Sequence, residues 1–206
     1  MKLYNVDASP NCFRVRAVIN ELDLSVELID VNLRARSEEF LAVSPGGKVP
    51  GFVDDDGFTL FESRAINNYL ASKAPARGLY PDDYKRRAIV DQWSYWHAIH
   101  LGPAVNALTF ERVGKVAWGM GTPDEAVITA KLAEIAQFLP VLERGLAGKT
   151  WLAGSLTTAD FAVASTFVAR RQANIPLDNF PNVTAWLERI EALPSWKAAL
   201  PKYLSK

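Results

Sequence analysis

The sequence predicts an α/β domain followed by an all-α domain. Three observations lead to this prediction. Strand and helix patterns alternate over the first 75 residues, a segment containing proline and glycine follows, and only helical periodicity remains beyond residue 84. A chain of 206 residues also has room for two small domains. We therefore expect an α/β domain over residues 1–75, a linker over 76–83 and a helical domain over 84–206.

The first domain is expected to have the element order β-α-β-α-β-β-α. Its strands are short apolar or alternating runs, and its helices place apolar side chains three and four residues apart. Asp56-Gly57 between two apolar runs indicates a hairpin. The expected strands are Lys2 to Val6, Ser25 to Leu33, Val49 to Val53 and Phe58 to Phe61, and the expected helices are Cys12 to Leu24, Ser37 to Leu41 and Glu62 to Lys73.

The second domain is expected to contain about five helices, because apolar side chains recur at helical spacing and no alternating run interrupts them. The expected helices are Tyr84 to Arg112, Pro123 to Leu146, Ala159 to Arg171, Val183 to Leu193 and Trp196 to Leu204. Residues 110–122, with Trp118, Met120 and three glycines, break this helical pattern. That segment is either core packing, a mobile loop or a surface for varied apolar ligands.

Composition excludes several classes of protein. Lysine plus arginine and aspartate plus glutamate both number 23, so no net charge attracts nucleic acid or an anionic membrane. The single cysteine, Cys12, excludes an intrachain disulfide. His97 and His100 have no acidic or cysteine partner at metal-ligand spacing, so no metal is expected. No signal peptide or membrane-spanning run is visible, and we expect a cytoplasmic protein.

The turn after the first expected strand reads Ser9-Pro10-Asn11-Cys12. A helix N-terminus offers free amides and partial positive charge, which favour a bound thiolate, and the Ser9 hydroxyl can donate to its sulfur. Serine is also well suited simply to cap the helix. A redox cycle of two cysteines is excluded, because Ser9 holds the position that the reactive cysteine of a Cys-x-x-Cys motif would take.

Two further segments have both a structural and a functional interpretation. Lys48-Val49-Pro50 is either the entry to a strand or a cis-proline turn that presents the Val49 backbone to a peptide ligand. Glu62-Ser63 is either an ordinary acidic first turn or a site for an amino-acid head. In the second case Ser63 and the free amides bind its carboxylate, and Glu62 binds its ammonium.

The order of these three segments resembles the glutathione site of glutathione S-transferases. The motifs that carry the resemblance are Ala-Ser at the first turn, Gly-Lys-Val-Pro before the third strand and Leu-Phe-Glu-Ser-Arg-Ala-Ile after the fourth. In the second half, residues 154–160 (GSLTTAD) are similar to the helix-capping signature of that superfamily, with Thr157 as the cap and Asp160 bonding back to it. The similarity is to serine-type, phi- or theta-like members, or to bacterial nu-like members.

The resemblance implies a thioredoxin-like N-terminal domain that binds glutathione as co-substrate and an all-helical domain that shapes the electrophile site. It also implies a homodimer and a role in detoxification. The implied roles are thiol activation for Ser9, backbone pairing with the cysteinyl unit for Val49, capture of the γ-glutamyl head for Glu62 and Ser63, and capture of the glycine end for Lys48, with Arg34 or Arg36 as its second ligand.

The implied activity is transfer of glutathione to hydrophobic electrophiles. An alternative is glutathione-dependent reduction of disulfides or peroxides, because Ser9-Pro10-Asn11 is similar to the Thr-Pro-Asn of nu-type proteins. Asn11 then assists at the sulfur, although it also suits a turn. A third alternative is a non-catalytic binding module that keeps the fold.

Overall fold

The computed structural model describes residues 1–204, and its contacts divide the chain into two compact units. Unit 1 is Met1–Asp83 together with the C-terminal segment that starts at Glu191, and unit 2 is Tyr84–Ile190. The division expected from the sequence, 1–75, 76–83 and 84–206, stays a prediction. In these contacts the segment from Glu191 groups with unit 1.

Unit 1 is built on a four-stranded mixed sheet with the order β2-β1-β3-β4. The central strand β1 (Lys2–Asn5) pairs in parallel with β2 (Glu27–Asp30) and antiparallel with β3 (Gly51–Val53). A hairpin joins β3 to β4 (Thr59–Phe61), as the Asp-Gly pair predicts. Together with three helices this sheet confirms the predicted α/β domain with its β-α-β-α-β-β-α order.

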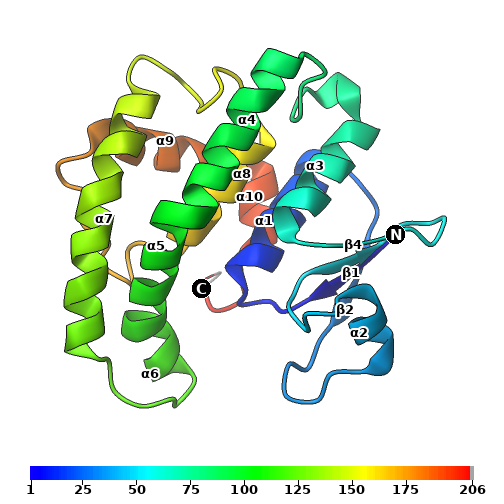
Figure 1. Cartoon of the computed structure of the whole chain (residues 1–206), viewed down its shortest axis with the longest axis horizontal. Coiled ribbons are helices and arrows are strands. Elements are labelled where there is room, and N and C mark those ends of the chain that lie inside the picture. The colour runs from blue at the N-terminus through cyan, green and yellow to red at the C-terminus, as the bar shows by residue number, and fades with distance from the viewer. Residues whose placement is uncertain (205–206) are drawn as a thin grey trace. The chain divides into compact units, whose positions relative to one another are not determined.

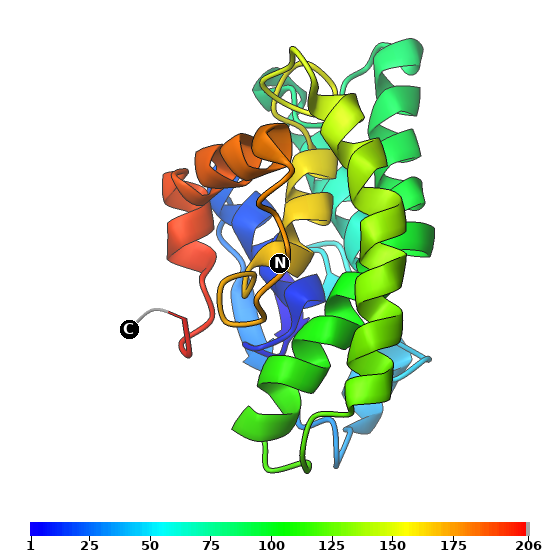
Figure 2. The same cartoon turned by 90° about the vertical axis from the view of Figure 1, so that its left-hand side faces the viewer.

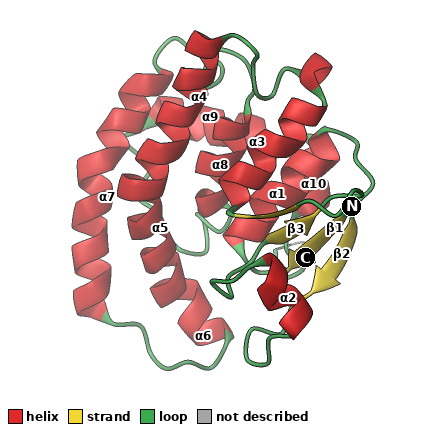
Figure 3. Cartoon of the chain, turned by 45° about the vertical axis from the view of Figure 1, so that its right-hand side comes forward, coloured by secondary structure: helices red, strands yellow, loops and turns green. Residues whose placement is uncertain are grey.

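The helices of unit 1 cover both faces of the sheet. α1 (Pro10–Glu21) and α3 (Ser63–Lys73) lie side by side on one face, and α2 (Glu38–Val43) covers the other (Figure 1). α10 (Pro194–Ala199) packs against α1, as the view in Figure 3 also shows. The ring of Phe13 in α1 meets the ring of Trp196 in α10 edge to face, with centroids 4.5 Å apart.

Unit 2 is helical throughout its regular structure, as predicted. Its longest helix, α7, runs beside α5, which Figure 2 shows from the side. Two π-helical turns, His97–Leu101 and Phe110–Gly114, interrupt the path from α4 to α6. The helices are α4 (Tyr84–Trp96), α5 (Gly102–Thr109), α6 (Lys115–Ala117), α7 (Glu125–Leu146), α8 (Thr158–Ala164) and α9 (Pro181–Glu191).

The predicted capping signature begins α8. The buried Asp160 carboxylate accepts the backbone N–H of Thr157 at 2.9 Å and of Leu152 at 3.0 Å, and it accepts the indole N–H of Trp186 at 3.0 Å. Burial raises the pKa of this carboxyl, and the hydrogen bonds oppose the shift. Asp160 therefore joins the start of α8 to the core of unit 2, a structural role as expected.

Several helices end elsewhere than the periodicity predicts. The helical path expected over Tyr84 to Arg112 continues to Ala117, because the π-turns absorb extra residues without ending it. α8 ends at Ala164 and a 3₁₀ turn follows, and α10 ends at Ala199, ahead of Pro201, which cannot continue a helix.

No helix within residues 1–204 is both long and apolar enough to cross a membrane. In the same range, no three His, Cys, Asp or Glu side chains gather where they could hold a metal ion.

Candidate active site

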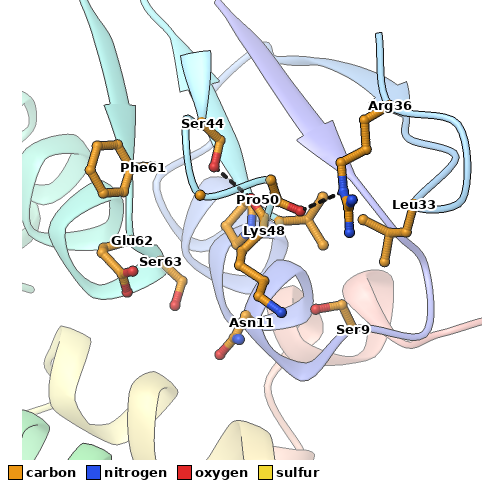
Figure 4. Close-up of a pocket in the computed structure, with 13 residues that line it drawn as sticks. Ser9, Asn11, Leu33, Arg36, Ser44, Lys48, Pro50, Phe61, Glu62 and Ser63 are labelled. Carbon is orange, nitrogen blue, oxygen red and sulfur yellow. Dashed lines mark hydrogen bonds between the residues drawn. The ribbon is translucent and has the colours of Figure 1, made fainter. Parts of the chain in front are cut away.

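A cavity of about 380 Å³ opens in unit 1 where the turns after β1, before β3 and after β4 meet. Its walls include Ser9, Asn11, Lys48, Val49, Glu62 and Ser63, for which a catalytic or glutathione-binding role is expected. In Figure 4 the side chains of Ser9, Asn11 and Lys48 point to one part of the cavity, with Glu62 and Ser63 at its other side. The structure thus brings the predicted residues together, and their roles stay predictions.

Ser9 is the N-cap of α1. Its backbone is extended, with φ −76° and ψ 123°, and its Oγ accepts the backbone N–H of Cys12 at 3.3 Å. Pro10 occupies the first helical turn, where a backbone N–H would have no partner within the helix, so the missing N–H of proline costs no hydrogen bond. A hydroxyl has two acceptor lone pairs and one proton, so the cap bond leaves the Ser9 proton available for a ligand. The capping and thiol-activating interpretations are therefore compatible.

Cys12 lies below the cavity rather than in it. Its side chain is fully buried, and its Sγ accepts the backbone N–H of Val6 at 3.4 Å. Burial raises the pKa of the Cys12 thiol, which keeps it protonated and poorly nucleophilic. Cys12 is therefore poorly placed to supply a thiol to the cavity.

The segment before β3 presents its backbone to the cavity. The Ser44 hydroxyl donates to the carbonyl of Lys48 at 2.7 Å. The Val49-Pro50 peptide bond is cis, which agrees with the second interpretation of this segment. Arg36 Nε donates to the carbonyl of Gly47 at 3.0 Å, which holds the Arg36 side chain in the wall (Figure 4).

Arg36 and Arg34 were the two alternatives for the second cation at the glycine end. Arg36 lines the cavity, whereas Arg34 is exposed and absent from its walls. The backbone N–H of Arg34 donates to Asn32 Oδ1 at 3.0 Å, in the turn that follows β2. The geometry therefore favours Arg36, which together with Lys48 makes one end of the cavity positive.

The opposite end is the N-terminus of α3. Glu62 adopts the left-handed region, with φ 71° and ψ 108°, and no side-chain hydrogen bond caps the helix. Ser63 is 4% exposed and forms the first residue of the helix. Uncapped amides and a buried hydroxyl form a favourable place for a carboxylate. A positive φ in a non-glycine residue is uncommon and often marks a functional position.

Sequence reasoning missed one residue of this end, Arg14. It precedes Val18 by four residues and Leu22 by eight, so it lies on the apolar face of α1. An arginine on such a face was the signal available, because charged residues are almost never fully buried without a partner. Leu33 and Ser44 also line the cavity, and no pattern in the sequence marks them, whereas Phe61 lies in the Leu-Phe-Glu-Ser motif.

The mixed sheet, its helices and the helical second unit define a two-domain protein whose first domain is thioredoxin-like. Family models agree with each half. Residues 3–78 match the N-terminal domain of glutathione S-transferases, and residues 94–194 match their C-terminal domain.

Relatives and solved structures agree over the whole length. The chain is 36% identical to a glutathione S-transferase of Hyoscyamus muticus, with 97% of each chain covered. It is 36% identical to glutathione S-transferase 3 of Zea mays, over 98% of this chain and 95% of that one. A structure of glutathione S-transferase I bound with lactoylglutathione superposes with a TM-score of 0.86 at 30% identity, covering 96% and 97% of the two chains. The chain belongs to the glutathione S-transferase superfamily, and the plant relatives make it phi-like.

Proposed function

We propose that the protein is a glutathione transferase, which activates the glutathione thiol for attack on a hydrophobic electrophile. The observation that carries this proposal is the position of Ser9 Oγ, which lines the cavity at the N-terminus of α1 with its proton free of the cap bond. Asn11 lies beside it in the same wall and is the second candidate for contact with the sulfur.

The energy required is within reach of these groups. A free thiol has a pKa of about 8.5, so only a few per cent is thiolate at neutral pH. Lowering that pKa by about 2 units requires about 2.7 kcal/mol of preferential stabilisation. One hydrogen bond to a charged group contributes about 1.5–3 kcal/mol and a helix N-terminus about 0.3–1 kcal/mol. The thiolate then attacks an electrophilic carbon, forms the carbon–sulfur bond and displaces the leaving group.

Glutathione is proposed to lie along the cavity with one carboxylate at each end. Lys48 and Arg36 hold the glycine carboxylate, and the Val49 backbone pairs with the cysteinyl unit. Ser63 and the free amides of α3 hold the γ-glutamyl carboxylate, while Glu62 holds its ammonium. The charges support this direction, because Arg36 lies at the side of the cavity opposite Glu62, with Lys48 between them (Figure 4).

The electrophile is proposed to bind apolar side chains of the helical unit. Val116, Trp118 and Met120, at the end of α6 and in the loop after it, are 62%, 55% and 57% exposed. Large exposed apolar side chains near one another suit varied hydrophobic ligands.

The resemblance of the chain to this family also supports a homodimer and a cytoplasmic location. Exposed Phe61 and Ile99, at 50% and 69%, are consistent with pairing between chains.

A second function, glutathione-dependent disulfide or peroxide reduction, is favoured by Asn11 in the cavity wall beside Ser9. The buried Cys12 would take no part in it. The test is to supply purified protein and glutathione with an aryl halide, a mixed disulfide and a peroxide in turn. Conjugation faster than reduction supports the transferase. Faster turnover of the disulfide would establish the reductase, and no turnover of any substrate would establish a binding module.

The proposed homodimer is tested by sedimentation at micromolar concentration. We expect a species of twice the chain mass, and a single species near the chain mass of 22.8 kDa would contradict the proposal.

A further inference from the structure

A buried arginine lies directly behind the α3 end of the cavity. Arg14, in α1, is 1% exposed and is among the largest fully buried side chains of the described chain. Burial, and next to it the charge of Arg64, holds the pKa of Arg14 well below its usual range. Taking a guanidinium out of water is expensive, so its contacts at this place need an explanation.

The contact of interest joins Arg14 to the cavity wall. Arg14 Nη1 donates to Ser63 Oγ at 3.4 Å, which links α1 to the first residue of α3. Arginine has donors and no acceptor, so the Ser63 oxygen must accept in this pair. Ser63 cannot give its proton to Arg14. Within residues 1–204 the side chain of Ser63 has no other hydrogen-bond partner, so its proton is left for the cavity.

The charges near the α3 end of the cavity also favour a bound carboxylate. The charge of Arg64 lowers the pKa of Arg14, and the charge of Glu62 favours the charged form of both arginines. A ligand carboxylate that reaches Ser63 therefore meets a hydroxyl proton with positive charge behind it. Interactions of this kind are strong where water is excluded, and Ser63 is 4% exposed.

We propose that Arg14 is a positioning residue of the glutathione site: its bond to Ser63 Oγ turns the Ser63 proton toward the γ-glutamyl carboxylate of the ligand. This inference rests on the proposed function, since it names the ligand of that site. Arg14 acts on the ligand through Ser63 and touches no reacting atom.

Asn67 provides a matched control, because it makes the neighbouring link between the same two helices. It lies one turn after Ser63 in α3, is fully buried, and its Nδ2 donates to the backbone carbonyl of Arg14 at 3.4 Å. A change at Asn67 therefore disturbs the packing of α1 on α3 and leaves the bond between Arg14 and Ser63 in place.

The experiment compares two ligands by calorimetry on the full-length chain. One ligand is glutathione, and the other is 4-aminobutyryl-cysteinyl-glycine, which lacks only the γ-glutamyl carboxylate. Arg14→Met keeps an unbranched apolar stem, shorter than that of arginine, and removes the donors. We expect it to weaken glutathione binding about tenfold, the loss of one hydrogen bond to a charged group, and to change analogue binding less than twofold. Arg14→Lys restores a donor and should recover part of the loss.

A control variant distinguishes a positioning role of Arg14 from a packing role. Asn67→Leu should change the affinities of the two ligands by the same factor. If Arg14→Met weakens both ligands equally, or neither, Arg14 is a packing residue and the inference is wrong. A wild-type protein that binds no glutathione would overturn the proposed function and this inference together, whereas equal losses in a protein that binds glutathione overturn the inference alone.

A measurement on the wild-type protein covers the case in which Arg14→Met fails to fold. The side-chain nitrogen signals of Arg14 are followed by NMR while each ligand is added. Glutathione should shift them and the analogue should leave them nearly unchanged. Signals that respond equally to both ligands would refute the positioning role.

Discussion

Ser9 caps α1 and is proposed to donate to the ligand sulfur, and these two roles can be separated by mutation. Its oxygen accepts the N–H of Cys12 at 3.3 Å, and that bond does not use the hydroxyl proton. Ser9→Ala removes the acceptor and the proton together. Ser9→Asp keeps a good capping acceptor, but at neutral pH it has no proton to donate and adds a negative charge.

The size of each effect follows from the contacts. Loss of an N-cap costs about 0.5–2 kcal/mol, and the long cap bond of Ser9 suggests about 1 kcal/mol of stability for Ser9→Ala. Loss of one hydrogen bond to a thiolate, about 1.5 kcal/mol, raises the pKa of the bound glutathione thiol by about 1 unit. Ser9→Asp should retain the stability of α1 and raise that pKa further, because its negative charge faces the thiolate.

Two assays measure these effects independently. The ultraviolet absorbance of the bound thiolate, titrated against pH, gives the pKa, and denaturant unfolding gives the stability. Ser9→Thr is the control, because it retains both an acceptor and a proton and should keep part of each effect. Identical thiol titrations of wild type, Ser9→Ala and Ser9→Asp would refute thiol activation by Ser9 and leave it as a helix cap, and Asn11 would be tested next.

Three other predictions follow from buried or unusual groups. Cys12→Ala should keep most conjugating activity, because the thiol is buried below the site, and an inactive but folded variant would make Cys12 a working thiol. Glu62→Gly should be at least as stable as Glu62→Ala, because glycine tolerates the φ of 71°, while both raise the KM for glutathione; the reverse order of stability would show that this backbone carries no strain. Hydrogen bonds from Lys73 and then Tyr69 lower the pKa of Asp54 to about 2, so its contribution to stability is present above pH of about 4 and is lost as the pH falls through about 2. Unfolding of Asp54→Asn across that range should show a weaker loss than wild type, and parallel curves would contradict the pairing.

Local features of the fold could be predicted because their causes are local. Asp56-Gly57 indicated the hairpin, and Gly57 indeed adopts φ 86° between β3 and β4. Asp160 was predicted three residues after the Thr157 cap, and it bonds back to the Thr157 amide at 2.9 Å. In both cases the residues that interact lie within a few positions of each other, so the pattern contains the interaction.

The candidate site could be predicted only in part. Sequence motifs identified its three segments, but they did not identify the residues that hold those segments in place. The contact of Arg14 with Ser63 joins residues 49 positions apart. Arg36 is favoured over Arg34 because it lines the cavity, where it donates a hydrogen bond to the Gly47 carbonyl. Each of these depends on tertiary contacts that no short window of sequence encodes.

The association of α10 with α1 affects the order in which this chain can fold during synthesis. Arg16 donates to the carbonyl of Ala199 at 3.1 Å, and Phe13 packs on Trp196, so the first unit includes a helix translated after all of residues 84–190. While the ribosome makes unit 2, α10 is not yet available, so the surface of α1 that contacts α10 stays exposed in the first 83 residues. A nascent chain with this apolar flank open is a natural client for chaperones. The first part of the protein to be made is therefore among the last to be completed.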